Sequence, residues 1–183
     1  MRRLGYLLVE ELSRDEHAGA LFLVDERGIP LDFLYTLPVR PTRVQRVIYG
    51  RALSSYLRGE LIPQALVGEL RDPDLPSLWL LRDRSLLEGA SVWWRKVPAV
   101  WISSTSERPL ESVGDLKDLG GEVLAQLDPV SSPYRISSYP PDRRSLEEAV
   151  RVLCEVSSKV ELEEPFSRAL EALRIAVQEG GGS

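Results

Sequence analysis

Apolar and polar residues alternate near the N-terminus, and this pattern predicts β-structure. Between positions 29 and 36 every second residue is large and apolar, which is the period of two that a pleated strand requires. The preceding stretch GALFLVD (19–25) is apolar on both faces, which favours a central strand. Asp25 and Gly28 bracket a connection short enough for a hairpin. We therefore expect these two stretches to pair, with an earlier strand in GYLLVEE (5–11).

The middle of the chain changes to a helical pattern and then returns to strands. Thr42 followed by Gln45 is a capping-box pattern, which predicts a helix that begins at Thr42 and continues in two or three pieces to Leu70. The apolar side of its first turns consists of Val44, Val47 and Ile48. After a turn-rich segment, SLWLLR, DRSLLEGA and VPAVWIS (77–82, 83–90 and 97–103) indicate a strand, a short helix and a strand, an order that favours parallel pairing.

The C-terminal part has the clearest helical periodicity. Apolar residues recur at i, i+3 and i+4 over 145–157 and again over 165–178, and a second capping box begins at Ser145. We expect these two helices to form an αα-hairpin. Segments 121–129 and 132–141 are weaker strand candidates, and 104–121 is expected to be mainly an irregular excursion.

These elements predict an α/β (or α+β) fold. We expect a single domain over residues 1–179, with a mixed sheet of about five or six strands, by usual sheet sizes. It would have an N-terminal β-hairpin, flanking helices and the C-terminal αα-hairpin, followed by a flexible tail at 180–183.

Composition narrows the class of protein. Of 183 residues, 43% are hydrophobic and 28% charged, which is ordinary for a globular protein. No apolar run approaches the roughly 20 residues that span a bilayer, and no secretory signal is evident, so we expect no membrane partner and a cytoplasmic location. The absence of Asn and the scarcity of Gln and Met are typical of a thermophilic source. The sequence contains no phosphate-loop, dinucleotide-binding or zinc-protease motif, so we exclude the large enzyme classes that depend on these motifs.

One segment carries charge of a single sign. Residues 38–58 contain five arginines and no acid, although the whole chain has a net charge of −5. Arginines around a helix N-terminus suit an anionic ligand, and the candidate binding residues are Arg40, Arg43, Arg46 and Arg51. Because an acidic chain repels a polyanion, we favour a non-catalytic cytoplasmic interaction or regulatory module that binds an acidic protein partner and needs no cofactor. The same arginines could instead bind nucleic acid or a nucleotide, or pair with acids of this chain such as Glu161, Glu163 and Glu164. A homo-oligomer is a further open possibility.

The remaining chemistry-bearing residues support weaker hypotheses. Trp93 and Trp94 are adjacent, so their side chains point in different directions and one of them should offer an exposed indole to a base or a protein partner.

A second alternative to the non-catalytic module is a magnesium- or manganese-dependent phosphate or phosphodiester hydrolase. Its candidate metal ligands are Asp25, Asp72, Asp74 and Asp83. His17 falls in a predicted connection and is expected to be exposed, while Cys154 lies on an apolar helical stripe as a core thiol.

Overall fold

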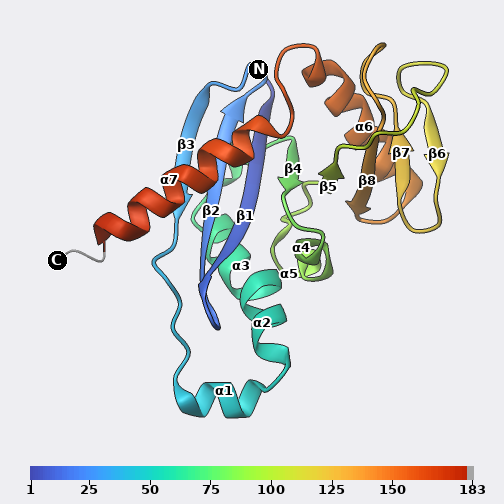
Figure 1. Ribbon diagram of the computed structural model, residues 1–183. Helices are drawn as coiled ribbons and strands as arrows, with labels where there is room; N and C mark the ends of the chain where they lie inside the picture. The colour runs from blue at the N-terminus through green and yellow to red at the C-terminus, as the bar shows by residue number, and fades with distance from the viewer. Residues whose placement is uncertain (181–183) are drawn as a thin grey trace.

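The computed structural model describes residues 1–180, and its centre is one eight-stranded mixed sheet (Figure 1). The strands are β1 (Arg3–Ser13), β2 (Glu16–Asp25), β3 (Pro30–Tyr35), β4 (Leu78–Leu81), β5 (Ala99–Ser103), β6 (Leu116–Asp118), β7 (Val123–Ala125) and β8 (Tyr134–Tyr139). The helices are α1 (Arg43–Tyr49), α2 (Ala52–Tyr56), the π-helix η1 (Leu57–Leu61), α3 (Ile62–Gly68), the 3₁₀ turn η2 (Asp72–Asp74), α4 (Ser85–Glu88), α5 (Ala90–Trp93), α6 (Arg143–Ser157) and α7 (Glu164–Gly180).

The strand order is β3-β2-β1-β4-β5-β8-β7-β6. The predicted hairpin is confirmed, because β2 and β3 pair antiparallel across the turn that follows Asp25. The strand–helix–strand prediction is also confirmed, since β4 pairs in parallel with both β1 and β5. The sheet is wider than expected because β8, β7 and β6 extend it antiparallel beyond β5, and β6 lies inside the predicted excursion.

Each face of the sheet is covered by a different group of helices, which gives three layers (Figure 1). The α6 and α7 side contains the larger core, in which the β1 side chains Leu4, Tyr6 and Leu8 pack. On the other face, Leu7 and Val9 of the same strand pack with residues of α3, α4 and α5. Strand β1 is therefore buried on both faces, as a central strand must be.

The two C-terminal helices form where the periodicity predicts them, but they do not form an αα-hairpin. Helix α7 packs on β1 and β2, whereas α6 packs on β8, so their main partner is the sheet and not one another. Asp142 caps α6 by accepting a hydrogen bond from the backbone N–H of Ser145 at 2.9 Å. Of the predicted tail at 180–183, Gly180 ends α7 and the other three residues lie outside the described part of the chain.

Helix α1 projects from the body at the end of an extended linker (Figure 1). The predicted capping box is present, because Thr42 accepts a hydrogen bond from the N–H of Gln45 and its own N–H donates to the Gln45 side chain. The apolar side of the helix, however, is not buried: Val44, Val47 and Ile48 are 66%, 83% and 74% exposed. The pattern is amphipathic as expected, but nothing within residues 1–180 buries this side of the seven-residue helix.

Candidate functional site at the strand ends

Charged residues follow the apolar cores of β1 and β4 at the carboxyl end of these parallel strands, where open α/β sheets bind ligands. The two strands run in register as far as Leu7 and Leu81. Glu10 and Glu11 lie beyond this point on β1, and the residues after β4 are Arg82 and Asp83. Because neighbouring strand residues point to opposite faces, each pair divides between the two sides of the sheet.

On the α7 side, one carboxylate is held by two guanidinium groups. Arg82 of the β4 end donates to Oε2 of Glu10 at 3.1 Å, and Arg174 of α7 donates to Oε1 of the same residue at 3.1 Å. Both arginines retain solvent contact while Glu10 is more buried. The cluster of Glu10, Arg82 and Arg174 therefore carries a net positive charge. Each carboxylate oxygen of Glu10 already accepts a hydrogen bond from one of the two arginines.

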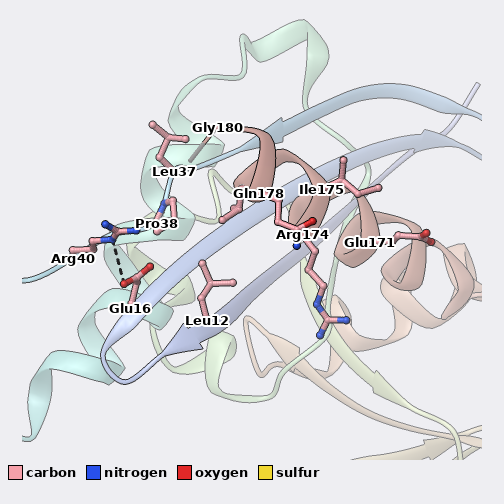
Figure 2. Close-up of a pocket in the computed structure, with 11 residues that line it drawn as sticks. Leu12, Glu16, Leu37, Pro38, Arg40, Glu171, Arg174, Ile175, Gln178 and Gly180 are labelled. Carbon is pink, nitrogen blue, oxygen red and sulfur yellow. Dashed lines mark ion pairs between the residues drawn. The ribbon is translucent and has the colours of Figure 1, made fainter. Parts of the chain in front are cut away.

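A groove of about 780 Å³ opens beside Arg174 (Figure 2). Its walls come from α7, from the end of the β1–β2 hairpin and from the linker at 37–40. Leu12, Leu37, Ile175 and Val177 form its apolar part. At its edge, Arg40 and Glu16 form an ion pair at 3.2 Å, which Figure 2 marks with a dashed line.

On the opposite side of the sheet, His17 is fully buried, so the expectation that it is exposed is wrong. It lies in β2 opposite Glu11, and its backbone forms a bridge with the backbone of Val39 in the linker. Neither ring nitrogen has a hydrogen-bond partner within residues 1–180. Burial lowers the pKa of His17, Arg58 lowers it further, and Glu11 acts in the opposite direction. Burial and the charge of Arg58 therefore both favour the neutral form of the ring.

Arg58 itself lies on the π-helix η1, and its position depends on tight packing of η1 against α4 and α5. Its guanidinium contacts Asp83 at 3.5 Å. The next residue, Gly59, approaches Gly89 so closely that a Cβ at Gly89 would lie 2.5 Å from the Gly59 carbonyl carbon. Trp93 donates from Nε1 to the carbonyl oxygen of Gly59 at 3.0 Å. These contacts place the guanidinium of Arg58 at the end of β4.

The tryptophan pair is mainly structural. Trp93 is buried under η1, and Trp94 is half-buried with its ring edge against Tyr139 at a centroid distance of 5.2 Å. The expectation that one of the two is partly exposed is met by Trp94. Its remaining surface is small because the ring also packs against the core on the α3–α5 side.

The arginines of the acid-free segment do not pair with the C-terminal acids. Arg40 pairs with Glu16, as described, while Glu164 pairs with Arg168 within α7. Arg43, Arg46 and Arg51 are exposed and form no ion pair with any residue that the structure describes. Three unpaired guanidinium groups are thus carried on and beside the projecting α1.

The four acids of the metal hypothesis do not gather into one cluster, although Asp72 and Asp74 share the turn η2, and each of them pairs with an arginine. Asp25 pairs with Arg27 in the β2–β3 turn, Asp72 with Arg95, Asp74 with Arg3, and Asp83 with Arg58. Residues 1–180 contain no group of three or more His, Cys, Asp or Glu side chains placed to hold a metal ion. At the strand ends the donor set does not fit a divalent cation either, because guanidinium groups occupy both oxygens of Glu10.

The fold and the strand-end site define a three-layer α/β protein with an extended mixed sheet, and solved structures share this architecture. No family model matches the sequence, and no curated protein matches it significantly. An endonuclease V from Streptomyces avermitilis is similar, with a TM-score of 0.63 and 17% sequence identity. The alignment covers 98% of this chain and 83% of the Streptomyces avermitilis chain. Human ENDOV has a TM-score of 0.58 and 16% sequence identity, and the alignment covers 100% of this chain and 87% of the human chain. A Ciona intestinalis endonuclease V, solved in complex with an inosine-containing 23mer DNA, has a TM-score of 0.56 and 11% identity, covering 97% and 86%.

These comparisons contradict the hypothesis of a non-catalytic module that binds an acidic protein partner. The three solved structures described above share the fold across nearly the whole chain and are endonucleases, and one of them holds DNA. That hypothesis weighed the net charge of the whole chain, whereas the charge of this protein is unevenly distributed. Within residues 1–180, no helix is long and apolar enough to cross a membrane.

Sequence reasoning missed Glu10, Arg82 and Arg174. The available signal was the position of charged residues directly after the buried strands at 5–9 and 78–81, because strand ends are the usual ligand edge. No sequence signal brings Arg174 to the same point, since it lies 164 residues from Glu10 along the chain.

Proposed function

We propose that this protein binds nucleic acid through Arg43, Arg46 and Arg51 on and beside the projecting α1. The observation that carries the proposal is that these guanidinium groups are exposed and unpaired within the described residues, on a fold shared with endonucleases. Arg40, at the edge of the groove, is a fourth contact in this proposal, with its pair to Glu16 exchanged for a phosphate. Arg43 and Arg46 are three residues apart and so are neighbours on the helix surface.

The acidic charge of the chain does not oppose this proposal, because no acid within residues 1–180 pairs with Arg43, Arg46 or Arg51 of the segment 38–58, here called the arm. Residues 38–58 carry a charge of +5, so the rest of the chain carries −10. At physiological ionic strength the interaction between exposed charges is largely screened beyond about 8 Å. Since α1 projects from the body, a phosphate at its surface interacts mainly with the arginines of the arm.

In this proposal the strand-end cluster of Glu10, Arg82 and Arg174 supplies a second contact. The tip of the β1–β2 hairpin lies at the end of the molecule from which the arm projects (Figure 1). Arg174 is exposed and Arg82 half-buried, and both contact Glu10. A strand of nucleic acid that contacts the arm has its second cationic contact there, and this contact needs no metal ion because the positive charges are guanidinium groups.

Binding to fluorescently labelled DNA and RNA, single- and double-stranded, tests the proposal by anisotropy across a salt series with EDTA present. The variant Arg43→Ala/Arg46→Ala/Arg51→Ala should weaken binding and flatten the log–log salt dependence for duplex DNA by about 2–3, close to 0.9 for each lost phosphate contact. The matched control is Arg108→Ala/Lys117→Ala/Arg144→Ala, which removes the same charge from exposed positions elsewhere. Absence of binding at low salt, or an equal loss in the control, would overturn the proposal.

A further inference from the structure

Helix α1 carries exposed apolar surface on both sides of its arginines. Three aliphatic side chains, here called the α1 stripe, are all more than half exposed: Val44, Val47 and Ile48. Tyr49, the last residue of the helix, is 41% exposed. With about 3.6 residues per turn, Arg43 and Arg46 lie between the stripe on one side of the helix and Tyr49 on the other. Charge and apolar surface therefore alternate around one short projecting helix (Figure 1).

Tyr49 also belongs to a stacked aromatic pair. Its ring lies against the ring of Tyr56 in α2, with the centroids 5.2 Å apart and an angle of 18° between the planes. Because Tyr49 is still 41% exposed, part of its surface stays open to solvent. Arg46 precedes it by three residues and Arg51 follows it by two. The stack thus fixes the orientation of an accessible aromatic ring among unpaired guanidinium groups.

A ligand that matches this surface must present negative charge and apolar faces side by side. The arm has five arginines and no acid, so the charge that it favours is negative. A nucleic-acid strand without a complement carries one phosphate and one accessible base in every nucleotide, and each base has a π-face that can stack on an aromatic ring.

We propose that the arm binds single-stranded nucleic acid, with its arginines on the phosphates and with Tyr49 and the α1 stripe on unpaired bases. This inference rests on the proposed function and specifies its substrate class.

Duplex DNA fits the arm less well, because its base faces are stacked on one another inside the double helix. Phosphate contacts alone would leave Tyr49 and the α1 stripe in water. A major groove admits an α-helix, but it presents mainly hydrogen-bonding base edges, and aliphatic side chains have no donor or acceptor for them. Either geometry leaves one of the two surfaces without a partner, whereas an unpaired strand contacts both.

The first test compares oligo-dT, which has no internal pairing, with duplex DNA of the same length, by anisotropy on the full chain with EDTA present. The unmodified chain should bind the single strand more tightly. Tyr49→Ala should weaken single-strand binding by about 5- to 150-fold, the range for loss of one stacked base. Duplex affinity and the slope of the salt dependence should stay unchanged, because no charge is removed. Tyr49→Phe keeps the aromatic face and should bind like the unmodified chain.

Two matched controls lie outside the arm. Tyr35 in β3 is 46% exposed and stacks on Phe33 with an angle of 27° between the rings, so Tyr35→Ala removes an equivalent exposed ring and should leave binding unchanged. Val47 and Val130 are 83% and 85% exposed. Of the variants Val47→Ser and Val130→Ser, only the first should weaken binding of the single strand.

The outcomes separate this inference from the proposed function. Equal affinity of the unmodified chain for both probes, or an equal loss for both on Tyr49→Ala, would refute single-strand recognition. The proposed function would still stand if Arg43→Ala/Arg46→Ala/Arg51→Ala weakened binding to both probes. Failure of the unmodified chain to bind either probe at low salt would refute both.

Photochemical cross-linking tests the base contact in the unmodified chain, so its result does not depend on how a variant folds. Oligo-dT in which single thymines are replaced by 5-iodouracil forms covalent bonds with aromatic side chains stacked on the base when it is irradiated. Mass spectrometry of the digested complex should identify Tyr49 as the main cross-linked residue. Cross-links confined to residues outside 38–58 would overturn the inference.

Discussion

Gly89→Ala should strongly destabilise the protein, because the packing of η1 on α4 and α5 leaves no room for a methyl group. The new Cβ would overlap the carbonyl oxygen of Gly59 and lie 2.5 Å from its carbon. Both atoms belong to the backbone, so relief requires a shift of η1 relative to α4. The backbone dihedrals of Gly89 are φ −97° and ψ 2°, which alanine tolerates, so conformational strain at this residue adds little.

The magnitude follows from two contributions. Overpacking a close contact costs about 1–3 kcal/mol. Moving the Gly59 carbonyl also lengthens the hydrogen bond from Trp93, and a buried indole N–H without its partner costs about 1–3 kcal/mol. Together they predict a loss of about 2–6 kcal/mol in the free energy of unfolding. Because Arg58 precedes Gly59, the same shift should move its guanidinium away from Asp83.

Urea denaturation followed by circular dichroism measures this loss, and Gly59→Ala is its matched control. A Cβ at Gly59 would find its nearest neighbour, the backbone of Gly89, at 3.7 Å, an ordinary van der Waals distance. Since alanine also has the higher helix propensity, Gly59→Ala should be neutral or stabilising by up to about 1 kcal/mol. A Gly89→Ala protein within about 0.5 kcal/mol of the unmodified chain would refute the packing argument.

Three further predictions concern charge and burial. His17 is the only histidine and its pKa is lowered in the folded state by burial and by Arg58, so the unfolded state binds its proton more readily. The stability contributed by neutral His17 should be fully present above pH 6.5, the ordinary pKa of histidine. Below that pH the free energy of unfolding should decrease by up to about 1.4 kcal/mol per pH unit. In His17→Leu this pH dependence of the free energy of unfolding should be lost between pH 6.5 and 5. Leu153→Asp places a charge at a fully buried position of α6, so the free energy of unfolding measured by denaturant titration should fall by more than about 4 kcal/mol. The control Arg151→Asp, on the exposed side of the same helix, should change this free energy by less than about 1 kcal/mol. Glu10→Gln releases two guanidinium groups at the strand ends and should raise nucleic-acid affinity and steepen its salt dependence; an unchanged slope would show that this cluster makes no phosphate contact.

Local patterns in the sequence were enough to predict most of the elements. The β2–β3 hairpin follows from alternation over 29–36 and a short turn, and the start of α1 follows from Thr42 and Gln45. The order strand, helix, strand over 77–103 indicated parallel pairing, which the structure has between β4 and β5. Each of these depends on residues or elements that follow one another directly along the chain, so the physical cause is visible in a local window.

The site and its exposed surfaces were decided by tertiary structure. Glu10 meets Arg82 and Arg174 across 72 and 164 residues, and no local pattern specifies such a contact. The same holds for His17, which a short window places in a polar connection, although pairing with β1 and the linker covers it. The helical periodicity of α1 indicates which side is apolar but not whether anything covers it, because burial depends on where the rest of the chain lies.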